Sequence, residues 1–185
     1  MSWQRRAAGF LTWLSPGRPV GGDDVSVGEL SVEDAYATWA DDLVRYAAVL
    51  VAPRDAADVV SDAFASLLGN ESGWDRAVDP RRFLFGVVAN TARSHHRATA
   101  RRNRRASQVA ALTPVPDRDA ADVGGSQDHV IGALGELSPQ QRSVVYLAYW
   151  EDLTVAEIAD TLDVSDGTVR RQLARARDRL RRVLP

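Results

Sequence analysis

The sequence predicts an all-α protein in which two small helical domains are joined by a flexible linker. Apolar residues recur at helical spacing in several separate stretches, most of them opened by a helix-capping residue. No segment has the alternating apolar and polar pattern of a half-buried strand. Between the two groups of helical stretches lies Ser107–Gln127, which contains Pro, Gly and several Asp residues and lacks helical periodicity.

Composition restricts the possible chemistry. The 185 residues leave room for two small domains, and the absence of cysteine excludes disulfides, Cys-based zinc sites and thiol nucleophiles. The net charge of -2 conceals an uneven distribution, because acids dominate residues 23–79 while Arg93–Arg105 contains six arginines and no acid. Such a pattern favours a basic partner for the front of the chain and nucleic acid for the arginine-rich segments.

Residues 1–30 form a predicted N-terminal extension. Arg5 and Arg6 precede the apolar run Ala7–Leu14, which loosely resembles a signal peptide but lacks a small-x-small cleavage site. We expect a short amphipathic or disordered extension instead. No apolar run approaches the length of a membrane-spanning helix, and we expect a cytoplasmic protein.

Three helices are predicted in the first domain, residues 31–106. Ser31 caps a helix that should run to about Val51, Arg54–Leu68 forms the second, and Asp79 with Pro80 opens the third. The side chains expected to be buried in the first two helices include Ala35, Tyr36, Trp39, Leu43, Tyr46, Ala47, Leu50, Ala57, Val60, Phe64 and either Leu67 or Leu68.

Two charged features of this domain invite a functional interpretation. Asp55, Asp58 and Asp62 are spaced by three and four, so they line one stripe of a helix. This stripe is either a solvated face or a docking surface for a basic partner. Asn90, Arg93 and Arg97 share a face further along the chain. A solubilising helix end is one explanation of these arginines, and binding to nucleic acid is the interpretation that we favour.

The second domain, residues 128–185, is predicted to contain a helix over Asp128–Leu137, another from Ser138 to about Trp150, and a final pair of helices. Thr154 and Glu157 form a capping box for the first helix of that pair, and Ser165 opens the second after a break at Asp163–Val164. Arginines with small residues between them follow Ser165. This is the pattern of a DNA-binding helix-turn-helix, although a helical hairpin with a solvated basic face would share it.

No catalytic constellation is present in the sequence. There is no Gly-rich phosphate loop after a strand, and the histidines His95, His96 and His129 lack the spacing of metal ligands. We therefore expect a non-enzymatic protein without a cofactor or a metal.

Two ordered motifs resemble the sigma-70 family of bacterial RNA polymerase sigma factors, in particular the extracytoplasmic-function group. RDAADVVSDAF at Arg54–Phe64 and DPRRFLFGVVAN at Asp79–Asn90 are similar to the promoter-melting domain of region 2. LSPQQR at Leu137–Arg142, YWEDLT at Tyr149–Thr154 and the helix-turn-helix are similar to the C-terminal domain of region 4. These matches cover roughly Glu33–Val183.

The resemblance implies a factor that binds core RNA polymerase, directs it to specific promoters and assists DNA opening. Core docking on the beta-prime clamp helices would use Asp55, Asp58 and Asp62, and the beta flap is a further expected contact. The residues implied at the -10 element are Trp74, Arg76, Arg81, Arg82, Phe83, Asn90, Arg93, His96 and Arg97. Those implied at the -35 element are Ser165, Thr168, Arg170, Arg171 and Arg175. The linker would pass near the polymerase active centre.

The N-terminal extension is not part of the minimal family architecture, and an anti-sigma factor is a partner that only the resemblance suggests. Three other functions compete with this interpretation. A stand-alone helix-turn-helix regulator would need a dimerisation or effector domain, which the first domain does not resemble. An adaptor would use the acidic helix alone, and a DNA-processing enzyme would need a metal or nucleophile set.

Overall fold

The computed structural model describes residues 30–69, 73–109 and 134–183. Its described residues form helices and no strand, which confirms the predicted all-α fold. The helical segments are α2 (Val32–Leu50), the 3-10 turn η1 (Pro53–Asp55), α3 (Ala56–Leu68), α4 (Pro80–Val109), α6 (Pro139–Tyr149), α7 (Val155–Leu162) and α8 (Asp166–Val183). None of the described helices is both long and apolar enough to cross a membrane.

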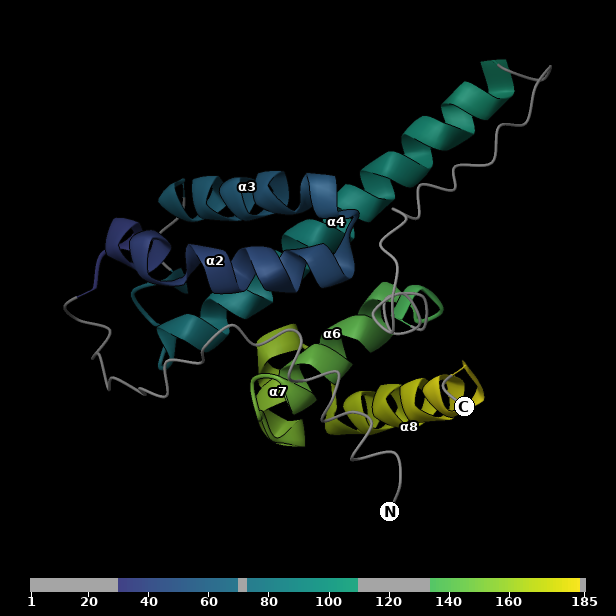
Figure 1. Cartoon of the computed structure of the whole chain (residues 1–185). Coiled ribbons are helices and arrows are strands. Elements are labelled where there is room, and N and C mark those ends of the chain that lie inside the picture. Colours follow the sequence, from purple (N-terminus) through teal and green to yellow (C-terminus); the bar gives the residue numbers. More distant parts are fainter. Residues whose placement is uncertain (1–29, 70–72, 110–133, 184–185) are drawn as a thin grey trace.

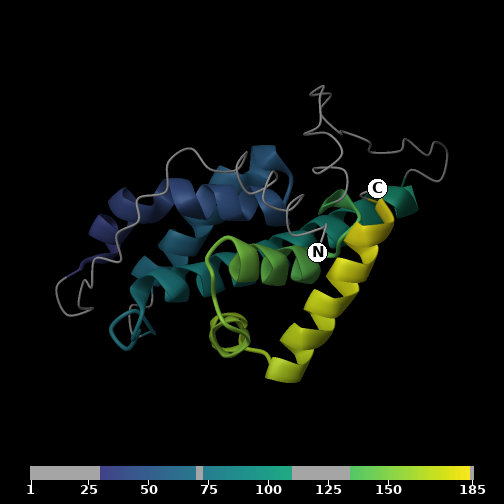
Figure 2. The ribbon, with the colours of Figure 1, turned by 60° about the horizontal axis from the view of Figure 1, so that its bottom comes forward.

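The helices form two groups, which we call the first domain (α2 to α4) and the second domain (α6 to α8). Figure 1 shows α2 between α3 and α6, so that α3 lies on the side of the first domain away from α6. The far part of α4 projects beyond both groups. Figure 2 shows the three helices of the second domain from another side, with α7 forming the short connection between α6 and α8.

The predicted helix starts at Ser31, Asp79, Ser138 and Thr154 are confirmed by local capping hydrogen bonds, whereas α3 begins after η1 without a side-chain cap. The Ser31 hydroxyl accepts from the backbone N–H of Asp34 at 3.0 Å, and the Asp79 carboxylate accepts from that of Arg82 at 2.9 Å. Reciprocal capping boxes open the two helices that begin after Ser138 and Thr154. Capping depends on residues within one turn, which is why the sequence reveals it.

The turn between α7 and α8 is also where the sequence predicts it. Asp163 ends α7 with a φ of 52°, in the left-handed region, and its N–H bonds back to the helix. Asp tolerates this conformation better than most residues. Ser165 then caps α8 by accepting from the N–H of Thr168 at 3.3 Å.

Two predicted core positions in the first domain are wrong. Ala57 is exposed, and Ala56, Val59, Val60 and Ala63 face inward instead. At 3.6 residues per turn Ala57 lies at the border of the inward-facing stripe of α3, so periodicity alone does not decide whether it is buried. Tyr36 is 45% exposed. Its ring edge rests on Phe64, with the centroids 4.9 Å apart, so it covers the core from outside.

The two domains share one continuous hydrophobic core. Tyr46 of α2, Phe85 of α4 and Tyr146 of α6 meet at its centre. The Tyr46 ring centroid lies 5.1 Å from that of Phe85 and 4.9 Å from that of Tyr146. The Tyr46 hydroxyl is hydrogen-bonded to that of Ser143 on α6. Burial raises the pKa of Tyr46, and the pKa of Tyr146 is raised by burial and by the nearby charge of Glu151.

The boundary of the first domain differs from the prediction at its C-terminal end. α4 continues to Val109, so the first three residues assigned to the linker are helical. The remainder of the linker, most of the Asp128–Leu137 helix and residues 1–29 lie outside the described residues.

Candidate nucleic-acid interface

The loop before α4 is anchored by Trp74. Its side chain is buried, its indole N–H donates to the Leu30 carbonyl at 3.2 Å, and its ring meets the half-buried Phe83 edge-on at 6.3 Å. Trp74 is therefore a core residue here, and its face is not open to a stacking base. Arg76 and Val78, in the same loop, are exposed, the latter at 92%.

Arg81 connects the two domains. Its guanidinium is 3.1 Å from a carboxylate oxygen of Asp42 on α2, and it forms a second ion pair with Glu151 after α6. It also lies over the Phe85 ring, 5.1 Å from the centroid. Burial acts to lower the pKa of Arg81, but hydrogen bonds and charge from Glu151 and Asp42 raise it overall. Burial raises the pKa of Glu151, an effect that Arg81 opposes.

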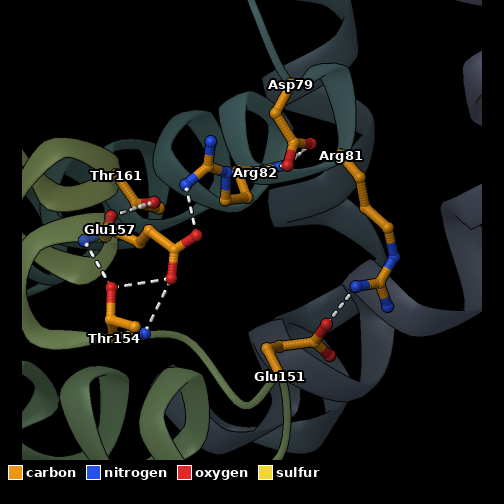
Figure 3. Close-up of polar contacts among 7 residues, drawn as sticks. All are labelled: Asp79, Arg81, Arg82, Glu151, Thr154, Glu157 and Thr161. Carbon is orange, nitrogen blue, oxygen red and sulfur yellow. Dashed lines mark hydrogen bonds and ion pairs between the residues drawn. The ribbon is translucent and has the colours of Figure 1, made fainter. Parts of the chain in front are cut away.

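Arg82 makes a second connection, shown in Figure 3. One of its nitrogens lies 3.1 Å from Glu157 on α7, while another lies 2.7 Å from Asp79, which caps its own helix. Glu157 also accepts from the Thr154 backbone N–H at 2.8 Å and from its hydroxyl at 2.7 Å. Those two bonds, and to a lesser extent the charge of Arg82, lower the pKa of Glu157.

The remaining candidate -10 residues on α4 are either exposed or in contact with another helix. Asn90, Arg93 and Arg97 are exposed, as the predicted shared face requires. A guanidinium nitrogen of Arg93 also reaches the Leu162 carbonyl on α7 at 3.5 Å. His96 is different, because a ring nitrogen lies 2.8 Å from the Leu50 carbonyl, so the imidazole is turned toward the end of α2.

The candidate -35 residues on α8 lie on the side of the helix opposite its buried face. Ser165, Arg170, Arg171 and Arg175 are exposed, and Thr168 is half-buried. Their contacts are short-range: Arg171 donates to the Thr168 hydroxyl at 3.2 Å, and Arg170 lies 3.8 Å from Asp166. Helix α8 is held to the domain through its opposite face, where the buried side chains are Val169, Leu173 and Ala176.

The acidic stripe is also accessible. Asp58 and Asp62 are exposed on α3, and Asp55 is half-buried at its start. The Asp55 carboxylate lies 3.9 Å from both Arg54 and His95. Among the described residues, no group of three or more His, Cys, Asp or Glu side chains is placed to hold a metal ion.

The structure thus separates the candidates into three surfaces rather than one site. The α3 stripe and the arginines of α8 face solvent, whereas Arg81, Arg82 and Arg93 meet the second domain. Glu151 and Gly86 received no role from the sequence. Glu151 pairs with Arg81, and the backbone of Gly86 lies against the Thr161 carbonyl of α7. A glycine within a helical pattern signals a close packing contact, but nothing local identifies its partner.

An all-helical protein with one arginine-bearing helix in each of two domains, one of them a helix-turn-helix, belongs to the class of DNA-binding transcription proteins. Sigma-70 region 2 matches residues 35–102, and Sigma-70, region 4 matches residues 129–180. The chain is also 35% identical to the RNA polymerase sigma-E factor of Streptomyces coelicolor over 161 residues, 84% of this chain and 86% of the relative. The chain belongs to the sigma-70 family of RNA polymerase sigma factors, in the extracytoplasmic-function group.

Other relatives carry similar names. The ECF RNA polymerase sigma factor SigK of Mycolicibacterium vanbaalenii is 28% identical, covering 72% of this chain and 69% of the relative. The solved structure of the sigma factor RpoE from Bartonella quintana, in complex with the anti-sigma factor NepR, matches with a TM-score of 0.62. It covers 82% of this chain and 95% of that chain at 20% identity, and it supports the two-domain helical fold. The chain's function is accordingly that of a promoter-specific RNA polymerase sigma factor.

Proposed function

We propose that each of the three surfaces of this sigma factor has a separate binding role. The acidic stripe of α3 binds the beta-prime clamp helices of core RNA polymerase. The loop at Trp74–Asp79 and the basic face of α4 bind and help to open the -10 element, and α8 reads the -35 element. The second domain also meets the beta flap. The observation that carries the proposal is the order of these surfaces along the chain, an acidic stripe followed by two arginine-bearing helices.

The docking role is supported by charge and accessibility. Asp58 and Asp62 are exposed on a helix that lies away from the second domain. Like charges that close together repel, and a basic partner relieves that repulsion. Complementary charge also speeds the encounter of two proteins.

The two DNA-binding roles rest on different chemistry. Arg170, Arg171 and Arg175 present guanidinium groups that suit phosphates and the major-groove edge of guanine. On α4, Asn90 and Arg97 stand beside the projecting part of the helix, whose arginines at 101, 102 and 104 are exposed. Because the face of Trp74 is covered, we assign Trp74 the shaping of the -10 loop, and an opened base would meet Phe83 and the exposed part of that loop.

In this proposal the protein catalyses no reaction itself, because its role is to bind promoter DNA and to position the polymerase there. An anti-sigma factor as a regulator is a further proposal. It is supported by the resemblance, and by the fact that the solved RpoE structure is a complex with such a factor.

Promoter-dependent transcription tests the proposed function. Core RNA polymerase from Streptomyces coelicolor, this protein and a randomised promoter library should yield run-off transcripts from a selected sequence, and none without the protein. Asp58→Arg combined with Asp62→Arg should weaken binding to core about tenfold or more, since it places positive charge against a basic surface. Asp160→Arg, a change at an exposed acid on α7, is the matched control. Tight duplex binding without any binding to core would instead indicate a stand-alone regulator.

A further inference from the structure

The side of α2 and α3 that faces away from the core carries two exposed apolar side chains. Tyr36 on α2 is 45% exposed, and Leu68 on α3 is 51% exposed. The Tyr36 ring rests on Phe64, which stands one helical turn before Leu68, so Tyr36 and Leu68 belong to one surface. We call this surface the α2–α3 face. Adjoining exposed apolar side chains are typical of a surface that binds another segment.

Acidic side chains border the apolar pair. Glu33 is exposed in the first turn of α2, and Asp58 and Asp62 are exposed on α3. Between these aspartates and the apolar pair, α3 presents the small exposed side chains of Ser61 and Ala65. The α2–α3 face therefore combines an apolar area, room for a neighbouring segment and negative charge.

The chain itself supplies a segment of complementary chemistry. The first 14 residues of the N-terminal extension contain Arg5 and Arg6 and no acid. The same residues include the aromatic side chains Trp3, Phe10 and Trp13. A segment that is both basic and aromatic matches a surface that is both acidic and apolar.

The N-terminal extension also joins the described residues beside this face. Leu30 directly precedes the Ser31 cap of α2, and its carbonyl accepts from the Trp74 indole at 3.2 Å. Figure 1 shows the start of α2 and the end of α3 at the same end of the first domain. A flexible connection of the length of Ser15–Glu29 averages roughly 20 Å between its ends. Helix α3, with 13 residues, is itself about 20 Å long, so the first 14 residues can reach the whole face.

We propose that residues 1–14 bind to the α2–α3 face of the same molecule. Their aromatic side chains cover Tyr36 and Leu68, and their arginines lie beside the acids of α3. A weak contact is sufficient, because a short tether gives an effective concentration in the millimolar range. At an effective concentration ten times the intrinsic Kd, the segment occupies the face about nine-tenths of the time.

The contact has a consequence for docking on polymerase. Residues 1–14 would use Asp58 and Asp62, the same aspartates that we assign to the beta-prime clamp helices. The N-terminal extension and core polymerase therefore compete for one surface. Occupation for nine-tenths of the time would weaken docking about tenfold. This competition rests on the proposed function of the acidic stripe, whereas the contact itself does not.

Paramagnetic relaxation in the full-length protein tests the contact. The chain contains no cysteine, so Ala65→Cys, at an exposed position on α3, carries a single spin label. This label should broaden the indole N–H signal of Trp13. The same label at Ala174→Cys, exposed on α8, is the control and should leave the signal sharp. An unbroadened Trp13 signal with the α3 label would overturn the contact.

Charge reversal separates a specific contact from the proximity that the tether alone produces. Arg5→Glu combined with Arg6→Glu should abolish the broadening, and the further changes Asp58→Arg and Asp62→Arg should restore it. Broadening that persists in the first variant would show that charge does not hold the segment and would refute the proposal. The wild-type protein with an isotope label is also mixed with an unlabelled, spin-labelled copy. Broadening in that mixture would assign the segment to a second copy and contradict binding within one molecule.

Binding of the fluorescently labelled protein to core RNA polymerase tests the competition. Arg5→Glu combined with Arg6→Glu should tighten this binding by up to about tenfold. Arg101→Glu combined with Arg102→Glu, at exposed positions on the projecting part of α4, is the matched control. It changes the net charge by the same amount and should not tighten the binding.

Trp3→Ser combined with Phe10→Ser is the second variant, and it removes the apolar contact without changing the charge. It should also sharpen the Trp13 signal and tighten binding to core. The two proposals fail differently. If relaxation shows the contact but neither N-terminal variant binds core more tightly than the wild type, the competition is wrong. If the wild type and both variants fail to bind core, the proposed function fails, and the relaxation experiment still decides the contact.

Discussion

Helices α4 and α8 both present arginines, yet their surroundings differ. On α8, Arg170 and Arg171 contact residues within one helical turn, and their outer face is exposed. On α4, Arg81 and Arg82 are paired with carboxylates about seventy residues away in the chain. The same residue type on the same kind of helix is available for binding in one domain and held by a neighbour in the other. Accessibility therefore distinguishes the first turn of α4 from α8, whereas Arg97 and the arginines further along α4 are exposed like those of α8.

The largest expected effect concerns how α4 is anchored. Trp74→Ala should destabilise the protein by about 3–5 kcal/mol, because the indole is buried against Phe83 and the Leu30 carbonyl. Chemical denaturation measures this loss. Trp74→Phe keeps most of the packing and should cost much less. An unchanged midpoint for Trp74→Ala, together with lost DNA binding, would instead make Trp74 a dedicated base contact.

A smaller effect is expected on α8, where binding and stability are separate. Arg171→Ala should weaken binding to the -35 duplex by about 1–3 kcal/mol if the guanidinium reads a base edge. Its contact with the Thr168 hydroxyl is exposed, so stability should barely change. Fluorescence anisotropy measures the affinity, with Arg182→Ala, an exposed change in the last turn of α8, as control. Equal loss of -35 binding and core binding would indicate damage to the fold.

The smallest effect is electrostatic and concerns Glu157, which both caps α7 and pairs with Arg82. Its pKa is lowered in the folded protein, so its charge stabilises the fold above the ordinary carboxyl pKa of about 4.5, and this is lost as pH falls through the lowered value. Glu157→Gln keeps an acceptor for the cap but removes the charge. The variant should be a few tenths of a kcal/mol less stable at pH 7, because the side chain is 38% exposed and screened.

Thermal unfolding at several pH values measures this difference. The gap between wild type and Glu157→Gln should close as the pH is lowered below the ordinary carboxyl value. A gap that persists in acid would show that the charge is not its cause.

Local features of the fold were predictable and long-range features were not. The caps at Ser31, Asp79, Ser138 and Thr154 depend on residues within one turn, and their predicted positions are confirmed. The family and its promoter-specific function were likewise recognisable from ordered motifs. Which individual residues contact DNA or polymerase stays a prediction, because docking geometry decides it.

The wrong and missing predictions have three separate physical causes. Phe85 and Tyr146 were not assigned to the core, because the inner stripe of a helix packed on two sides is wider than a single periodic pattern indicates. Ala57 was misplaced because it lies at the border of the inward-facing stripe of α3. The Arg81–Glu151 pair joins residues that no sequence pattern relates to each other.

The projecting end of α4 has a kinetic consequence. Its arginines at 101, 102 and 104 are exposed beyond the body of the protein, where the second domain does not cover them. A charged arm of this kind attracts phosphates over roughly one Debye length, about 10 Å at moderate salt. We therefore expect the arm to increase the rate at which DNA is captured. Added salt should slow this capture, because it screens the exposed arginines.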